Sequence, residues 1–357
     1  MLVLVTGGTG FVGSHSVSAL VAAGHDVRLL VRSPDRIAPA LRPLGVTTEV
    51  DHTVGDVTDP DSVQRALRGC DAVLHAAAVY NLDARARPAI ARTNVSGAET
   101  VLRAAVDAGC DPVVHVSSVV ALLRRGATVT PDSPLSTSPG AYIRSKAASE
   151  AVARRLQDDG APVVIVQPGG VLGPHDPHRG DQIRRLRDLL RGRYPLWPSG
   201  GFQIVDVRDV ARVHAAVMRP GAGPRRYLVP GHFVDGETMY GTLRALTGRR
   251  LPHLVLPSAL MLPVSWTTSM IQRVTPFHLP ADHEGVLITR SDTRCDDSRA
   301  RAELGIQPRP LAEIYGDTIR WLHRTGQLTT RQAGHTTSTE STPVGSPSAA
   351  EPGLDSD

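Results

Sequence analysis

Aromatic residues make up only 4% of this 357-residue chain, so its core must rest mainly on aliphatic side chains, which are plentiful among the 41% of hydrophobic residues. The three cysteines, Cys70, Cys110 and Cys295, lack disulfide or metal-site spacing, and this scarcity fits a reducing cytoplasm. No apolar run is long enough to span a bilayer, so we expect no stable membrane insertion. The first strand-like residues run into glycines rather than into a long apolar stretch, so we expect no secretory signal.

The chain also has no large excess of positive or negative charge. Lysine and arginine together number 39 against 35 acidic residues, so the formal net charge is only +4 despite a pI of about 9.2. The densest basic stretch has five arginines within residues 184–193, but Asp181 and Asp188 are interleaved with them. This pattern favours a solvated helix face over a phosphate patch, and we expect no nucleic-acid partner.

Lysine is the scarcest charged residue, because Lys146 is the only one among the 39 basic residues. Arginine could replace its charge but not its chemistry. A lysine is a compact donor whose pKa can be shifted, whereas an arginine is a rigid fork that stays protonated. Since a bias toward arginine could leave one lysine anywhere, the significance of Lys146 depends on its neighbours.

Apolar β-branched runs alternate with helical patterns through the first two-thirds of the chain. This alternation predicts an α/β fold: a Rossmann-type, doubly wound parallel sheet with helices on both faces, followed by a smaller and mostly helical C-terminal lobe. The expected strands span residues 2–5, 26–31, 72–75, 113–116 and 163–167. The expected helices span residues 12–23, 60–68, 89–108 and 141–158.

A glycine loop follows the first expected strand and opens the first expected helix. It satisfies G-x-G-x-x-G, with an additional glycine in front. Glycines permit a tight turn and a close backbone approach to a pyrophosphate, which the N-terminus of the following helix then attracts. In this context the loop predicts a dinucleotide site formed by Gly7, Gly8, Thr9, Gly10, Phe11, Val12 and Gly13.

The end of the second expected strand distinguishes NAD from NADP. A carboxylate there would accept hydrogen bonds from the adenosine ribose and repel a 2′-phosphate. The chain instead has Val31 at that position, followed by Arg32, and a guanidinium suits a phosphate dianion. We therefore favour NADP(H) with help from Arg36, while NAD(H) remains possible because Arg32 could be an ordinary surface arginine.

The sequence pattern divides the chain into three expected regions. Residues 1–230 are expected to form the NAD(P)-binding Rossmann domain, with 169–201 contributing to the substrate lobe, and residues 231–325 to form the substrate-binding lobe itself. Residues 329–357 are rich in Ser, Thr, Pro and Gly and predict a disordered tail. The apolar segment Leu254–Trp266 is interpreted as a helix lining a hydrophobic pocket, with an interfacial membrane contact as the alternative.

Tyr142 and Lys146 are spaced i, i+4 and therefore share one face of an expected helix. A nearby ammonium favours the phenolate and lowers the pKa of a tyrosine toward neutrality, which suits proton transfer. Upstream, Ser117 and Ser118 follow an expected strand, at the sheet edge where ligands bind. We predict that Ser118 holds a substrate oxygen while Tyr142 transfers its proton, with Ser117 as the fallback.

These motifs resemble the extended short-chain dehydrogenases/reductases, the NAD-dependent epimerase/dehydratase family, over residues 1–325. The resemblance extends to Asp71–Ala78 (D-x-x-x-H-x-A-A), Thr93–Gly97 (N-V-x-G), Gln167–Pro174 and Ile204–Ala211. It implies a homodimer, a small-molecule substrate and a supporting role for Asn94 at the active site. Together with the chain's own pattern, it implies cofactor contacts from Asp56, Val57, Ala76, Ala77, Ala78, Ser117, Tyr142, Lys146, Pro168, Gly169 and Val171.

Departures from the family pattern point to one branch of it. Nucleotide-sugar members continue the serine motif into V-Y-G, whereas this chain has Val119-Val120-Ala121, and Gln167 and Leu172 replace the usual Arg and Tyr of the later loop. The chain thus resembles dihydroflavonol-reductase-like and 3β-hydroxysteroid-dehydrogenase-like proteins, which implies an NADP(H)-dependent reductase or dehydrogenase of a moderately hydrophobic ketone, aldehyde or alcohol. Arginines 179, 184 and 187 support the alternative, a nucleotide-sugar epimerase or dehydratase with retained NAD.

Two further alternatives are a protein that binds a dinucleotide without catalysis and a protein that holds a metal ion. Some proteins of this fold bind a dinucleotide and act as non-catalytic regulators, but these typically lose the tyrosine or the lysine, and this chain has both. His175 and His178 could suggest a metal, yet no third ligand stands at a suitable spacing. We expect no metal there and interpret the segment as a loop bordering the substrate pocket.

Overall fold

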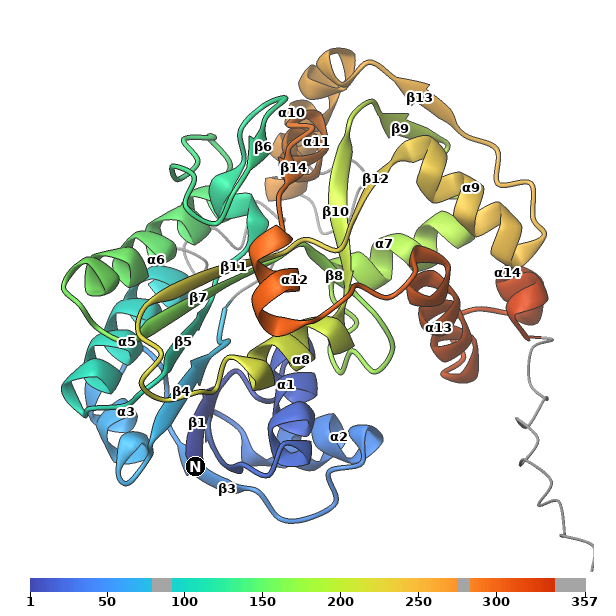
Figure 1. The fold of residues 1–357 in the computed structure, drawn as a ribbon. Coiled ribbons are helices and arrows are strands. Elements are labelled where there is room, and N and C mark those ends of the chain that lie inside the picture. The colour runs from blue at the N-terminus through green and yellow to red at the C-terminus, as the bar shows by residue number, and fades with distance from the viewer. Residues whose placement is uncertain (79–91, 275–282, 338–357) are drawn as a thin grey trace, which may run out of the picture.

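The computed structural model describes residues 1–78, 92–274 and 283–337. Its centre is a seven-stranded parallel sheet in the order β11-β7-β5-β4-β1-β2-β3, so the expected fold class is confirmed (Figure 1). The strand order reverses direction between β1 and β4, and this switch point opens a crevice at the carboxyl edge. The strands are β1 Leu2–Thr6, β2 Asp26–Val31, β3 Asp51–Val54, β4 Ala72–His75, β5 Val113–Val116, β7 Val163–Pro168 and β11 Arg225–Val229.

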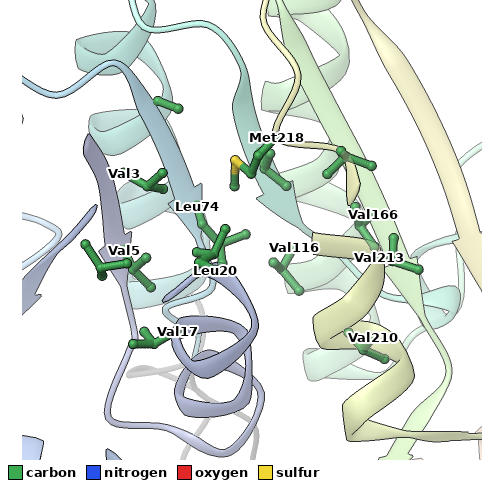
Figure 2. Packing of buried hydrophobic residues seen from close by; sticks show 14 of the residues in the cluster. Val3, Val5, Val17, Leu20, Leu74, Val116, Val166, Val210, Val213 and Met218 are labelled. Carbon is green, nitrogen blue, oxygen red and sulfur yellow. The ribbon is translucent and has the colours of Figure 1, made fainter. Parts of the chain in front are cut away.

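Helices cover both faces of this sheet, as right-handed crossovers between parallel strands require. One face carries α1 (Phe11–Ala22), α2 (Ile37–Leu41) and α8 (Val207–Ala216), and Figure 2 shows valines and leucines of α1 and α8 packed over the strands. The other face carries α3 (Pro60–Leu67), α5 (Gly97–Asp107) and α6 (Ala141–Asp158). Both cores are almost wholly aliphatic, in agreement with the low aromatic content.

One expected helix begins later than its sequence pattern indicates. The pattern favoured residues 89–108, but the α-helix α5 starts at Gly97, after a π-helical turn at Arg92–Ser96. Residues 89–91 of the expected helix lie outside the described residues. Gly97 packs tightly, since a Cβ there would stand 2.9 Å from a methyl group of Val57.

The smaller lobe has its own core, and aromatic side chains concentrate there. Trp197, Phe202, Tyr240, Tyr315 and Trp321 pack together with leucines of the lobe helices. The helices are α7 (Asp181–Leu190), α9 (Gly236–Thr247), α10 (Ser258–Val274), α11 (His283–Arg290), α13 (Leu311–Arg324) and α14 (Thr330–Ala333). The strands form one sheet of β8 (Gly170–Leu172), β10 (Gly201–Asp206) and β12 (His232–Asp235), and another of β9 (Leu196–Pro198) and β13 (Leu254–Leu256).

Two contacts join the C-terminal region to the Rossmann domain. The helix α12 (Ser298–Leu304) packs on β11 (Figure 1). There the Tyr227 hydroxyl donates to Glu303 at 2.6 Å. The short strand β14 (Arg294–Cys295) pairs with β6 (Thr128–Val129). Residues 231–325 therefore contribute to both the lobe and the sheet domain.

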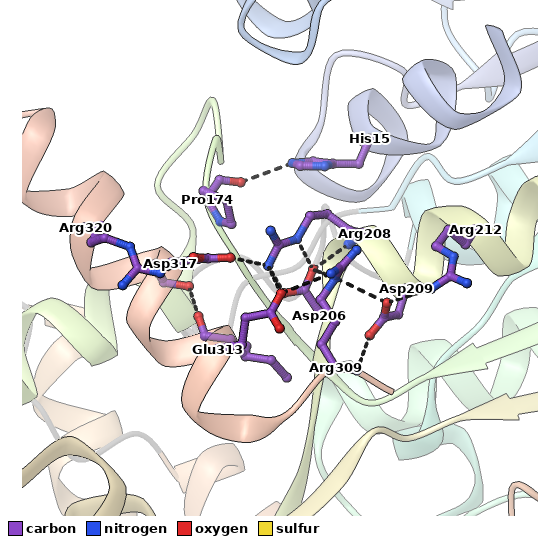
Figure 3. Close-up of polar contacts among 12 residues, drawn as sticks. His15, Pro174, Asp206, Arg208, Asp209, Arg212, Arg309, Glu313, Asp317 and Arg320 are labelled. Atoms are coloured by element: carbon purple, nitrogen blue, oxygen red, sulfur yellow. Dashed lines mark hydrogen bonds and ion pairs between the residues drawn. The ribbon is translucent and has the colours of Figure 1, made fainter. Parts of the chain in front are cut away.

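An ionic network around the buried carboxylates of Asp206 and Asp209 joins the lobe to the sheet domain (Figure 3). Asp206 is fully buried and caps α8, accepting from the backbone N–H of Arg208 at 2.8 Å, while the Arg208 guanidinium bridges Asp206 and Asp317 of α13 at 2.7 and 2.6 Å. These carboxylates raise the pKa of Arg208. Arg309 donates its backbone N–H to Asp209 at 2.7 Å and its guanidinium to Glu313 at 3.0 Å. The lobe is thus tied to α8 through charge-assisted hydrogen bonds.

The expected disordered tail does not begin at Thr329. Thr329 and Gln332 form a reciprocal capping box at the start of α14, and Ala333 is fully buried in the lobe core. A short turn, η6 (Gly334–Thr337), then packs against α9 and α13. The low-complexity composition gave no indication of the capped helix α14 or of the turn η6 that follows it. The rest of the expected tail, residues 338–357, lies outside the described residues.

Buried histidines should make the fold sensitive to acid. His75 and His214 are buried, and burial lowers the pKa of each to about 3. In the unfolded chain a histidine binds its proton near pH 6.5, so the stabilising contribution is complete above about pH 6.5 and is lost as the pH falls toward about 3. Between about pH 7.5 and 5.5 the two histidines should together remove about 3 kcal/mol from the free energy of unfolding.

Urea unfolding at the two pH values measures this loss. A His214→Asn variant should show a smaller difference between them, by about 1.4 kcal/mol. His52→Asn, at an exposed position on β3, is the matched control and should keep the wild-type difference. If the free energy of unfolding of His214→Asn differed between the two pH values by as much as that of the wild type, the lowered pKa of His214 would be contradicted.

Candidate functional site

The glycine loop between β1 and α1 has the geometry of an anion cradle. Gly7 has a φ of +74°, and a Cβ there would lie 2.7 Å from the backbone nitrogen of Ala77. A Cβ on Gly13 would lie 2.1 Å from the carbonyl oxygen of Gly7, so both positions require glycine. Within the described chain, no side chain caps the start of α1, whose first N–H groups therefore suit a dinucleotide pyrophosphate.

A cleft of about 570 Å³ runs from this loop across the carboxyl edge of the sheet. It brings together the predicted residues Gly7, Thr9, Gly10, Phe11, Val12, Gly13, Arg32, Asp56, Val57, Ala76, Ala77, Ala78, Ser117, Ser118, Tyr142, Lys146, Pro168, Gly169 and Val171.

Three predicted residues do not line the cleft: Gly8, Arg36 and Asn94. Gly8 packs against β2, since a Cβ there would stand 2.6 Å from a Leu29 methyl group. Arg36 is exposed on the short helix η1 (Pro34–Arg36).

Asn94 does not line the cleft but contacts the helix that carries Tyr142 and Lys146. It is buried, and its side-chain amide donates to the Ser145 hydroxyl at 3.1 Å. Ser145 in turn donates to the backbone carbonyl of Tyr142 at 2.8 Å. The structure therefore places Asn94 in contact with the helix α6, and its supporting role at the active site stays a prediction.

Tyr142 and Lys146 both lie on α6 and both line the cleft, as their spacing predicted. Lys146 is only 5% exposed, and its ammonium donates to the backbone carbonyl of Val116 at 3.2 Å. Burial lowers the pKa of Lys146 to about 8, and the Glu150 carboxylate opposes that shift. The cleft therefore holds a desolvated ammonium one helical turn from a phenol.

The two serines after β5 have different partners. The Ser117 hydroxyl donates to the buried Glu150 carboxylate at 2.5 Å. The Ser118 hydroxyl donates to the Pro168 carbonyl at 3.3 Å and accepts from the Val120 backbone N–H at 3.3 Å. Both hydrogen bonds of Ser118 are long, so its hydroxyl can turn to a substrate more easily than that of Ser117. This geometry favours Ser118 for the substrate contact.

Glu150 is a residue of the site that the sequence analysis missed. It is fully buried and accepts from Arg154 Nη2 at 2.6 Å and from Gln167 Nε2 at 2.8 Å, besides Ser117. The Gln167 that replaces the family arginine thus serves this network. The available signal was its spacing: Glu150 follows Lys146 by four residues and Tyr142 by eight, on one face of α6.

The substrate side of the cleft is formed mainly by apolar and uncharged residues. Val119, Val120 and Leu123 approach from the segment after β5, and Phe202 and Ile288 approach from β10 and α11. Among the described lining residues on this side, Arg185 is the only arginine.

The three arginines that supported a nucleotide-sugar substrate are not among the described residues that line the cleft. Arg179, Arg184 and Arg187 are absent from the described lining; Arg184 pairs with Asp181, and Arg187 pairs with Asp188. The loop before α7 does border the pocket, through Asp176, His178 and Gly180, as expected.

The interpretation of Leu254–Trp266 as the pocket-lining helix is wrong. Its first residues form β13, which pairs with β9, and the described residues of this segment do not line the cleft. Leu254, Leu260, Val264 and Trp266 are exposed instead. The described lobe helices that do line the cleft are α7 and α11. Sequence hydrophobicity alone did not distinguish a surface-facing apolar helix from a pocket-facing one.

The described residues offer neither a metal centre nor a membrane span. Over residues 1–78, 92–274 and 283–337, no group of three or more His, Cys, Asp or Glu side chains is placed to hold a metal ion. None of the helices in these ranges is long and apolar enough to cross a bilayer.

A Rossmann sheet, a glycine cradle and a tyrosine–lysine pair meeting in one cleft define an NAD(P)-dependent oxidoreductase of the short-chain dehydrogenase/reductase type. The chain belongs to the NAD dependent epimerase/dehydratase family, whose model matches residues 3–229.

Two curated relatives and one solved structure match nearly the whole chain. A putative dihydroflavonol 4-reductase of Synechocystis sp. is 30% identical over 338 residues, covering 92% of this chain and 96% of that protein. Sterol demethylase protein B of Methylococcus capsulatus is 32% identical over 337 residues, covering 92% of this chain and all of that protein. The crystal structure of gox2253 superposes with a TM-score of 0.77 at 29% identity, covering 92% of this chain and 99% of that one.

Proposed function

We propose that this protein is an NADP(H)-dependent reductase or dehydrogenase that transfers a hydride to or from a moderately hydrophobic ketone, aldehyde or secondary alcohol. The observation that carries the proposal is the placement of Tyr142 and Lys146 in a cleft whose substrate side is mainly apolar and uncharged. Names of relatives, such as dihydroflavonol 4-reductase, support the same class. The substrate would be a small molecule.

Each residue of the site has a defined part in this reaction. The Tyr142 phenol donates its proton to the carbonyl oxygen of the substrate, and the Ser118 hydroxyl donates a hydrogen bond to the same oxygen. The Lys146 ammonium stabilises the phenolate that remains. The dinucleotide, held at the glycine cradle, supplies the hydride when bound.

The preference for NADP(H) rests on Arg32. It lies at the end of β2, is exposed and lines the cleft, and it makes no hydrogen bond or ion pair with another described residue. Its guanidinium is therefore available to a 2′-phosphate, and the neighbouring Val31 offers no carboxylate to an NAD ribose.

Replacing Arg32 by alanine is expected to weaken NADPH binding about 10- to 100-fold, because a charge-assisted hydrogen bond contributes about 1.5–3 kcal/mol. NADH binding should change less than about 2-fold, since NADH has no 2′-phosphate. Titration of nucleotide fluorescence measures both dissociation constants. Arg42→Ala, at an exposed position outside the described cleft lining, is the matched control. Tighter binding of NADH than NADPH by the wild-type protein would contradict the cofactor assignment.

The reaction itself is tested by absorbance of the reduced nicotinamide. A panel of aldehydes and ketones of graded hydrophobicity should produce net oxidation of NADPH by the wild-type protein. A nucleotide-sugar epimerase would retain its cofactor and show no net change with its own substrate.

Two alternatives remain distinguishable from this proposal. A nucleotide-sugar epimerase or dehydratase is favoured by the breadth of the family, but among the described residues on the substrate side of the cleft Arg185 is the only arginine that could contact a sugar diphosphate. A non-catalytic dinucleotide-binding regulator would bind NADPH and turn over no carbonyl. A homodimer and a cytoplasmic location stay predictions.

A further inference from the structure

The start of the catalytic helix α6 is capped by a residue from the other lobe. Its own N-cap position is Gly140, which has no side chain to offer, and its first turn contains no acidic residue. Instead, the carboxylate of Glu284 on α11 accepts from the backbone N–H of Tyr142 at 2.9 and 3.2 Å through its two oxygens. An N–H group in the first helical turn has no partner within the helix, so this contact satisfies it and places a negative charge at the positive end of the helix.

The contact between Glu284 and the start of α6 is buried, and the glycine before the helix leaves room for it. Glu284 is 6% exposed although it belongs to a residue type that is rarely buried. A Cβ on Gly140 would stand 2.9 Å from the Glu284 carboxylate, so the glycine leaves the space that the carboxylate occupies. The sequence separation of 142 residues explains why no local pattern indicated it.

The same helix, α11, also reaches the substrate side of the cleft. Its residues Gly285, Ile288 and Thr289 line the cleft, and the helix packs against α6 and β10. Glu284 directly precedes these lining residues. One rigid element therefore contacts the substrate space with one part and the backbone of the proposed acid with another.

We propose that Glu284 is a positioning residue for the reaction: it fixes the backbone of Tyr142 and couples the substrate-lining helix α11 to the general acid. The proposal rests on the proposed reductase function. A phenol must stand within hydrogen-bond reach of the substrate oxygen, and a first turn that frays would move it out of reach. The chemistry stays with Tyr142, and Glu284 acts through it.

Replacing Glu284 by alanine should lower kcat about 10- to 100-fold, the equivalent of one lost charge-assisted hydrogen bond, while KM for the carbonyl and the NADPH dissociation constant change less than about 3-fold. Glu284→Gln keeps one acceptor oxygen of the same length and should recover most of the lost kcat. Glu237→Ala is the matched control, because its side chain is 69% exposed on α9 of the same lobe.

Hydrogen exchange gives a readout that does not depend on turnover. In Glu284→Ala the first-turn amides of α6, including that of Tyr142, should exchange about 10-fold faster or more, whereas the last turn at Arg154–Asp158 should keep its wild-type rate. Unchanged first-turn exchange, or wild-type kcat in Glu284→Ala, would overturn the proposal. If the wild-type protein oxidises no NADPH with any carbonyl, the proposed function fails, and the exchange rates alone then decide whether Glu284 holds the start of α6.

Discussion

Replacing Tyr142 by phenylalanine is expected to lower kcat about 1,000-fold while the dissociation constant for NADPH stays within about 2-fold of the wild-type value. The substitution removes one oxygen and with it the proton that the carbonyl must receive. Tyr142 is only 6% exposed, and the phenyl ring fills the same space, so the packing of α6 is preserved. Binding and chemistry should therefore separate in this variant.

Steady-state oxidation of NADPH and a nucleotide titration measure the two effects. Tyr227→Phe is the matched control: that hydroxyl donates to Glu303 on α12, away from the cleft lining, so its loss should leave turnover intact. Turnover by Tyr142→Phe at the wild-type rate would eliminate the tyrosine mechanism. Loss of NADPH binding in the same variant would instead assign Tyr142 to the cofactor rather than to proton transfer.

Replacing Lys146 by arginine is expected to lower kcat about 100- to 1,000-fold although the positive charge is retained. The ammonium occupies a site that is 5% exposed and donates to a single described acceptor, the Val116 carbonyl. A planar guanidinium is larger and carries its charge over three nitrogens, so it cannot reproduce the compact contact of the ammonium with the Val116 carbonyl.

Kinetics of Lys146→Arg should be compared with those of Arg155→Lys, the reverse exchange at an exposed position of the same helix. The control should behave like the wild-type protein in both turnover and thermal unfolding. Circular dichroism of Lys146→Arg checks that the fold persists. Activity within a few fold of wild type would mean that charge alone suffices at this position, and the specific role of the lysine would be lost.

The sheet domain was largely predictable from the sequence because its signals are local. The strands β2, β4 and β5 have the expected bounds, and β1 and β7 extend one residue further. Such strands are short apolar runs followed by a turn, a pattern that neighbouring residues determine. The tyrosine–lysine pair was predictable for the same reason, since both residues lie on one helix.

Features that depend on distant residues were not predictable in this way. The cap from Glu284 and the ionic network around Arg208 join segments more than a hundred residues apart, and no spacing rule selects one carboxylate among many. The prediction that Leu254–Trp266 lines the pocket was wrong for a related reason. An apolar pattern indicates a hydrophobic face but not which surface, if any, covers that face. Concentration of the aromatic residues in the lobe likewise depends on which segments pack together.

The single lysine gives this protein an unusual surface for covalent labelling. Apart from the amino terminus, amine-directed reagents have only one target, and it is buried inside the cleft rather than distributed over the exterior. A pKa of about 8 leaves part of that amine unprotonated and nucleophilic in mildly alkaline solution. The extent of acylation at Lys146 would therefore report directly on whether the cleft is filled, without any reporter group having to be introduced.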